Sequence, residues 1–138
     1  MSTSCFENCS NLKKAVFATA TQCAGNKSFS GCRKLEELRL PQCTSALNSI
    51  MSATAAVSLR ILDVKTTNWN YSFTSAGANL ELVILRGDSV VTGTPVFHAS
   101  SPIKLGTGRI LVPSSLVNDY KTAWADYASI ISAIGEGD

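Results

Sequence analysis

The chain has 138 residues, of which 45% are hydrophobic and only 16% are charged, with a formal net charge of +2. The apolar share excludes an intrinsically disordered chain, and no apolar run approaches the roughly 18 residues that a membrane-spanning helix needs. The small net charge gives no argument for a nucleic-acid-binding protein.

The pattern of residues 1–56 predicts a helical hairpin that carries all five cysteines. Ser4–Glu7 fits a capping box, in which a hydroxyl and a carboxylate satisfy the first amides of a helix. Apolar residues then recur at helical spacing as far as Gly25, a residue typical of helix ends. After a loop, we expect a short helix over 32–39, which Pro41 ends and from which the next helix begins.

The cysteines of this segment allow three interpretations. If the hairpin turns near residue 27, Cys23 faces Cys32 and Cys9 faces Cys43, and two disulfides would staple it with Cys5 left over. Thiols can also serve as small apolar side chains of a helix seam, or four thiolates can hold zinc. The spacing contains no C-x2-C pair, so we predict no metal site and treat Cys9, Cys23, Cys32 and Cys43 as disulfide or core candidates.

Residues 57–113 predict an antiparallel sheet of five or six strands. Apolar and polar residues alternate over 57–65 with one change of phase, which is typical of a β-bulge. Glycine-containing turns separate the apolar runs, and this favours antiparallel neighbours. The other runs that predict strands are residues 69–74, 80–85, 89–91, 96–98, 103–105 and 110–112.

Residues 114–134 predict one amphipathic helix, capped by Ser114 or Ser115 and packed on the sheet. Its apolar side is rich in aromatic residues, which also allows a seam between two copies of the chain. The interface candidates are Tyr120, Trp124, Tyr127 and Ile131.

We detect no internal repeat in the sequence. No linker rich in proline or glycine divides residues 1–56 from residues 57–138, so we expect the helical segment and the sheet with its last helix to form one compact unit. The predicted fold is therefore α+β: an N-terminal helical hairpin, an antiparallel sheet and a C-terminal helix.

No group of residues predicts catalysis or a cofactor. His98 is the only histidine, and no G-x-S-x-G motif supplies an exposed serine. Arg86-Gly87-Asp88 is a tripeptide that integrins recognise, but it is also an ordinary charged turn. A basic strip that includes Lys13, Lys14, Lys34 and Arg39 could bind RNA, although the sheet segment is acidic overall.

We predict a non-catalytic structural or assembly subunit that associates with copies of itself or with a partner protein, as in a virus particle. The alternative is a small binding module for RNA or a small ligand, or a zinc-held hairpin, and an enzyme of unknown class comes third. Nucleic acid is the less favoured partner. Neither a signal peptide nor a transmembrane segment is predicted, and the localisation stays open.

Overall fold

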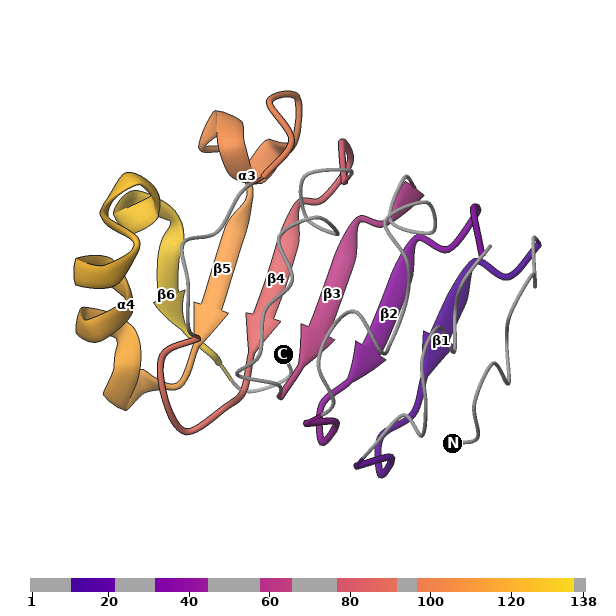
Figure 1. Cartoon of the computed structure of the whole chain (residues 1–138), viewed down its shortest axis with the longest axis horizontal. Helices are drawn as coiled ribbons and strands as arrows, with labels where there is room; N and C mark the ends of the chain where they lie inside the picture. Colours follow the sequence, from indigo (N-terminus) through magenta and orange to yellow (C-terminus); the bar gives the residue numbers. More distant parts are fainter. Residues whose placement is uncertain (1–10, 22–31, 45–57, 66–76, 92–96, 136–138) are drawn as a thin grey trace.

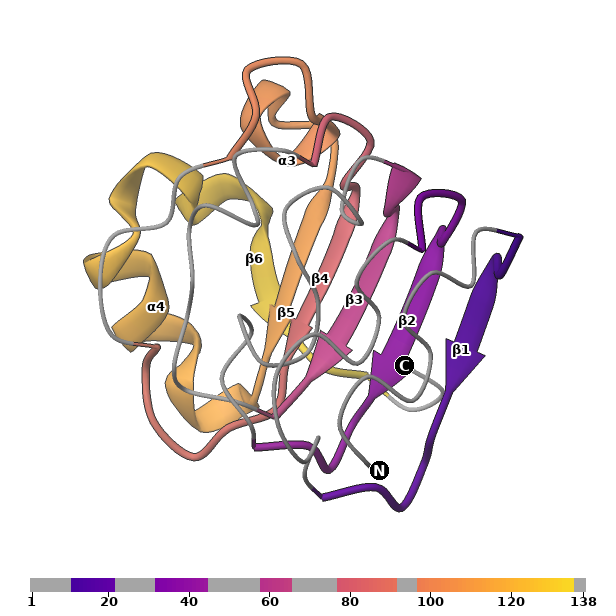
Figure 2. The ribbon, with the colours of Figure 1, turned by 45° about the vertical axis from the view of Figure 1, so that its right-hand side comes forward.

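The computed structural model describes residues 11–21, 32–44, 58–65, 77–91 and 97–135. Within this part of the chain, six short strands form one sheet whose order follows the sequence (Figure 1). Every neighbouring pair is parallel, so all strands begin at the same edge (Figure 2). The strands are β1 (Lys14–Val16), β2 (Glu37–Leu40), β3 (Ile61–Val64), β4 (Leu82–Leu85), β5 (Arg109–Val112) and β6 (Ile131–Ala133).

Equivalent residues of successive strands pair in register and form straight rows across the sheet. Side chains alternate between the two sides of a strand, so alternate rows point to the same side. One row runs from Ala15 through Leu38, Leu62 and Val83 to Ile110, and it lies in the hydrophobic core. The residues two positions further along belong to the core as well; they are Leu40, Val64, Leu85 and Val112.

One apolar spacing recurs along the chain. Three segments share the pattern in which a leucine is followed by aliphatic residues three and five positions later. These sets are Leu35, Leu38 and Leu40; Leu59, Leu62 and Val64; and Leu80, Val83 and Leu85, and every member is at most 1% exposed. The chain is therefore built from structural repeats, with successive strands starting 21 to 27 residues apart.

A repeated backbone contact joins each repeat to the next at the start of the strands. The carbonyl of Lys13 accepts the amides of Glu36 and Glu37, and the carbonyl of Glu36 accepts those of Arg60 and Ile61. Two consecutive residues thus lie opposite one, as in a β-bulge, and both point away from the core. This geometry explains why the apolar residues before and after them are three positions apart.

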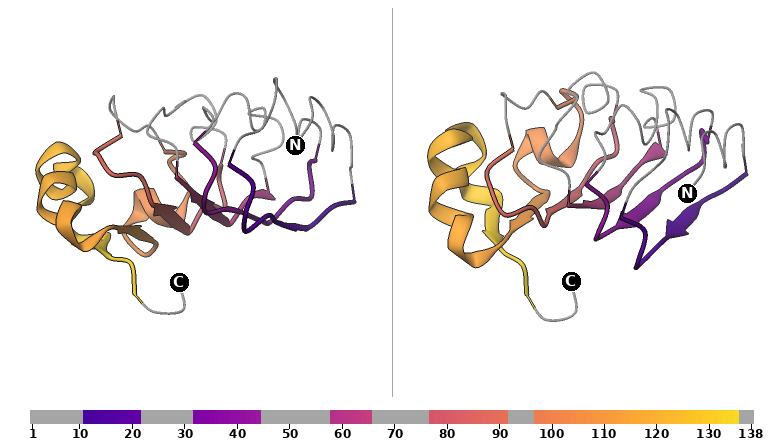
Figure 3. Two further views of the ribbon diagram at one scale, coloured as in Figure 1. Left: turned by 90° about the horizontal axis from the view of Figure 1, so that it is seen from below. Right: turned by 60° about the horizontal axis from the view of Figure 1, so that its bottom comes forward.

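Short helices close the C-terminal end of the sheet. They are α3 (Pro102–Leu105), the 3-10 turn η2 (Ser114–Leu116), α4 (Val117–Ala123) and the 3-10 segment η3 (Ala125–Ile130). Of these, α4 lies beside β6 at one end of the strand layer, and α3 lies at the start of β5 (Figure 3). Ser101 caps α3 by accepting the Lys104 amide, and Gly106 ends it with a φ of 84°. Gly108 has no room for a side chain, because a Cβ there would lie 2.6 Å from the Glu81 carbonyl oxygen.

The predicted α+β fold with an antiparallel sheet is wrong. The sheet is parallel throughout its six described strands, and Lys14–Val16 and Glu37–Leu40 are strands where a helical hairpin was expected. The spacing of three residues between Leu35 and Leu38 imitates a helix, but it comes from the bulge at the start of each strand.

The last predicted helix is also corrected. The α-helix ends at Ala123, and the chain then forms η3 and the sixth strand. Residues 103–105 are helical, and residues 89–91 and 97–98 form no strand. The predicted strand over 69–74 lies outside the described residues. None of the helices in the described part of the chain has the length and hydrophobicity to cross a membrane.

Candidate functional site

The side of the sheet that faces away from the core carries two rows of side chains, which we call the outer face. The first residues of the strands form one row, from Lys14 through Glu37, Ile61 and Leu82 to Arg109. The third residues of β1 to β5 and the second residue of β6 form the other row. Its members are Val16, Arg39, Asp63, Ile84, Leu111 and Ser132.

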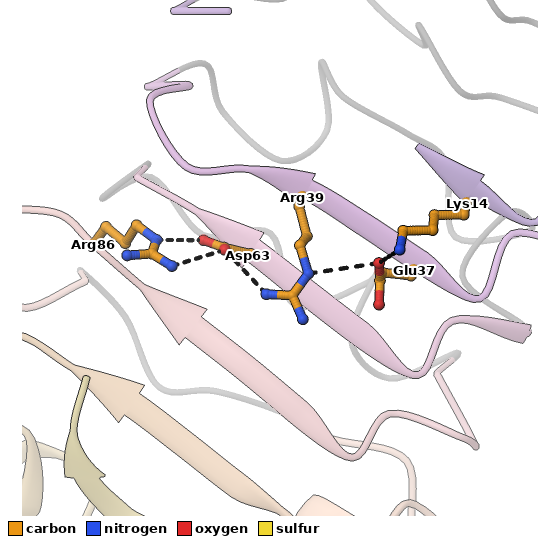
Figure 4. A network of polar contacts seen from close by, with 5 residues as sticks. All are labelled: Lys14, Glu37, Arg39, Asp63 and Arg86. Atoms are coloured by element: carbon orange, nitrogen blue, oxygen red, sulfur yellow. Dashed lines mark hydrogen bonds and ion pairs between the residues drawn. The ribbon is translucent and has the colours of Figure 1, made fainter. Parts of the chain in front are cut away.

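Charges of alternating sign cross β1 to β4 on this face (Figure 4). We call the five residues Lys14, Glu37, Arg39, Asp63 and Arg86 the charge ladder. The Glu37 carboxylate lies 3.1 Å from the Lys14 ammonium and 3.6 Å from the Arg39 guanidinium. Arg39 in turn lies 3.5 Å from Asp63, so one unbroken series of ion pairs joins consecutive repeats.

Asp63 is the most buried member of the charge ladder, with 2% of its side chain exposed. Arg86 donates two hydrogen bonds to it, from Nε to Oδ1 at 2.7 Å and from Nη2 to Oδ2 at 3.0 Å. A bidentate pair of this kind fixes both side chains and compensates the buried carboxylate. The charge ladder is therefore a rigid element of the outer face, and its three cations and two anions leave one positive charge.

The outer face differs between its two halves. Over β1–β3 it presents four members of the charge ladder together with Val16, which is 48% exposed. Over β4 and β5 the corresponding row is apolar, and Ile84 and Leu111 are 0% and 1% exposed. Lys14 and Val16 on β1 are thus accessible to a partner, as are Arg109 on β5 and Ser132 on β6, whereas the apolar part of the row between them is buried.

Two of the four candidate cysteines fall in the described part of the chain. Cys32 and Cys43 both belong to the hydrophobic core, where each is fully buried. Cys9 and Cys23 lie outside the described residues, so the predicted disulfides stay predictions. Within the described ranges, no three side chains of His, Cys, Asp or Glu come together as metal ligands.

The four aromatic and aliphatic interface candidates close the C-terminal end of the core. Tyr120, Trp124, Tyr127 and Ile131 are at most 7% exposed within the single chain. Tyr120 packs edge-to-face on Trp124, and Tyr127 does so on Phe97, each at a centroid distance of 5.1 Å. Little of these side chains is accessible to another molecule, and their role between copies stays a prediction.

The Tyr120 hydroxyl ties the segment after β4 to this end of the molecule. It accepts the Val91 amide at 3.0 Å and donates to the Ser89 carbonyl at 3.4 Å. Burial raises the pKa of Tyr120 above its ordinary value of 10.0, and the hydrogen bond from Val91 opposes this rise. The neutral Tyr120 phenol therefore holds the segment after β4 against α4 through these two hydrogen bonds, and we call this contact the Tyr120 clamp.

Other residues considered from the sequence have structural contacts. The His98 ring accepts the Ser100 amide at 3.0 Å. Arg86, the first residue of the Arg-Gly-Asp tripeptide, is engaged with Asp63, which leaves its guanidinium unsuited to integrin recognition. Of the basic strip, Lys14 and Arg39 pair with carboxylates of the charge ladder.

Glu37 and Asp63 are the members of the charge ladder that the sequence reasoning did not assign to a site, and Arg86 was considered only as part of the Arg-Gly-Asp tripeptide. Alternation predicts that Asp63 points away from the core, but its two arginine partners lie 24 and 23 residues away in the sequence. Those separations equal the length of one repeat, so charges that recur at the repeat length were the available signal.

The match to a known family agrees with this repeating architecture. The model of the BspA type leucine rich repeat region matches residues 1–116 as six copies. The prediction that the sequence has no internal repeat is therefore wrong. No curated protein matches the chain.

Proposed function

Because the chain belongs to the BspA-type leucine-rich repeat family and is a repeat module suited to protein–protein interaction, we propose that it binds a partner protein through the outer face over β1–β3. The observation that carries this proposal is the charge ladder, five side chains held in register across consecutive repeats. Ordered side chains lose little conformational entropy on binding, and this favours recognition by a preformed surface.

The chemistry of the outer face suits a protein partner. Val16 offers an exposed apolar contact, and Lys14 and Glu37 beside it are available for polar contacts at its edge. An apolar contact surrounded by polar groups is the usual composition of a protein interface. The family match gives no support to a virus-particle component. Self-association also stays a prediction, because nothing in the described chain identifies a second copy as the partner.

Site-specific photocross-linking tests the proposal. A benzoylphenylalanine is placed at Val16 on the outer face or at Asn118, an exposed residue of α4, and each protein is irradiated in extract of the source cells. We expect a discrete cross-linked protein from Val16 and none from Asn118. Equal products from both positions, or a product from Asn118 alone, would contradict binding through the outer face.

A further inference from the structure

A recess lies beside the outer face, along the edge where the strands begin. It has a volume of about 350 Å³ and is lined by Lys13, Lys34, Glu36, Ser58, Arg60 and Asn79. These residues come from four consecutive repeats, so the recess runs across the strands. Neighbouring strands are about 4.8 Å apart, and four of them therefore span about 15 Å, the length of four to five residues of extended chain.

The charges of the recess favour an anionic occupant. Three of its lining residues are cations and one is a carboxylate. Arg60 is paired with Glu81 at 2.7 Å, and the Lys34 ammonium donates to the neutral amide oxygen of Asn11 at 3.4 Å. Lys13 and Lys34 form no ion pair within the described ranges, so both charges are available to a ligand.

The polar groups of the recess favour a peptide over a nucleic acid. Among the described residues the lining contains no aromatic side chain on which a base could stack, and the Glu36 carboxylate finds no hydrogen-bond donor on a phosphate backbone. The same carboxylate can accept backbone amides of a peptide. The Ser58 hydroxyl can bond to its polar groups.

From these observations we propose that the recess binds an extended acidic segment of the partner protein, whose carboxylates contact Lys13 and Lys34. This inference rests on the proposed function, because the acidic segment would belong to the protein bound at the outer face. To the proposed function it adds that the bound segment of the partner is acidic and extended, and that this segment lies in the recess.

The test uses a fluorescent octapeptide of alternating glutamate and serine, and binding is followed by anisotropy at low ionic strength. We expect the wild-type protein to bind this peptide, and to bind it less tightly as salt screens the charges. A peptide with glutamine in place of glutamate should not bind. The double variant Lys13→Gln/Lys34→Gln should bind the acidic peptide about fivefold more weakly, the loss of two exposed ion pairs.

Lys65→Gln/Lys121→Gln is the matched control, because it removes the same net charge away from the recess. Equal weakening in both double variants would reduce the binding to non-specific attraction and overturn the inference. Tighter binding of a single-stranded oligouridylate than of the peptide would also overturn it, in favour of nucleic acid. Circular dichroism of each variant shows that the fold is retained.

The cross-link from Val16 separates this inference from the proposed function. If Val16 captures a protein while wild-type protein fails to bind the acidic peptide, the acidic segment is wrong and the outer face stands as the binding surface. If the peptide binds through Lys13 and Lys34 while Val16 captures nothing, the recess stands and the role of the outer face is wrong.

Discussion

The two ends of the sheet share one inward pattern and differ in everything that surrounds it. At the N-terminal end, β1–β3 carry charged side chains on the outer face, from exposed Lys14 to buried Asp63, and the core rows behind them are aliphatic. At the C-terminal end, aromatic rings of α4 and η3 are buried against β6 and the segments before β5. The inner rows define the repeat, whereas the proposed binding function depends on the outer side chains.

This difference fits the physics of stacked repeats. A repeat buries its apolar side only against its neighbours, so the final repeat of an array needs a covering structure. Residues after 116 lie outside the family match, and they include α4, η3 and β6, which supply this cover. We therefore expect substitutions at the C-terminal end to affect stability most, and substitutions on the outer face over β1 to affect binding.

The largest effect is expected at Tyr120. Tyr120→Ala should lower the free energy of unfolding by about 3–5 kcal/mol, because it removes a fully buried aromatic ring. Tyr120→Phe keeps the ring and removes the hydroxyl bonded to Val91, and should cost about 1–2 kcal/mol. Urea unfolding followed by circular dichroism measures both. If both Tyr120 variants lost less free energy of unfolding than an exposed α4 variant such as Lys121→Gln, the C-terminal end would have no stabilising role.

A smaller loss of unfolding free energy is expected from a substitution in the middle of the charge ladder. Asp63→Asn should cost about 2 kcal/mol, because it leaves Arg86 and Arg39 without their buried counter-charge. Glu81→Gln is the matched control, since its pair with Arg60 is exposed and should contribute less than about 1 kcal/mol. The same urea titration compares them. An equal cost for the two variants would show that the charge ladder is an ordinary set of surface charges.

Alkaline pH provides a test of the Tyr120 clamp without changing its packing. The folded-state pKa of Tyr120 is raised, so its stabilising contribution is complete below pH 10.0 and is lost as pH rises through the folded pKa. Wild type should therefore lose more unfolding free energy between about pH 9 and pH 11 than Tyr120→Phe does. Parallel pH dependence of the two proteins would contradict the buried neutral phenol.

The smallest effect on stability is expected at Lys14, whose side chain is 67% exposed. Lys14→Gln should change the free energy of unfolding by less than about 0.5 kcal/mol, as for other surface ion pairs. It should nevertheless reduce the yield of the cross-link from Val16, because Lys14 lies on the proposed binding surface. A yield equal to that of Lys121→Gln would remove Lys14 from that surface.

The strand positions were more predictable than their directions. Three described strands, Ile61–Val64, Leu82–Leu85 and Arg109–Val112, fall on apolar runs that the sequence makes visible. Their parallel arrangement was missed because glycine-containing turns such as Arg86–Asp88 were taken to join strands directly. In the structure the chain completes a whole repeat between strands, so neighbours in the sheet are more than 20 residues apart.

The candidate site was less predictable, because it depends on register. Charges on Lys14, Glu37, Arg39 and Asp63 are unremarkable when each is considered with its own neighbours in the sequence. They become one network only when strands one repeat apart are placed side by side. The aromatic residues after 116 gave a true apolar pattern, but that pattern alone could not distinguish a cover within the chain from a contact between copies.

Hydrogen–deuterium exchange on the complex with the protein captured from Val16 tests the division between the two ends. The division predicts that binding slows amide exchange in β1, β2 and β3, while exchange in α4 and β6 stays as slow as in the protein alone. Protection confined to α4 and β6 would contradict it, because the partner would then contact the end that we assign to stability.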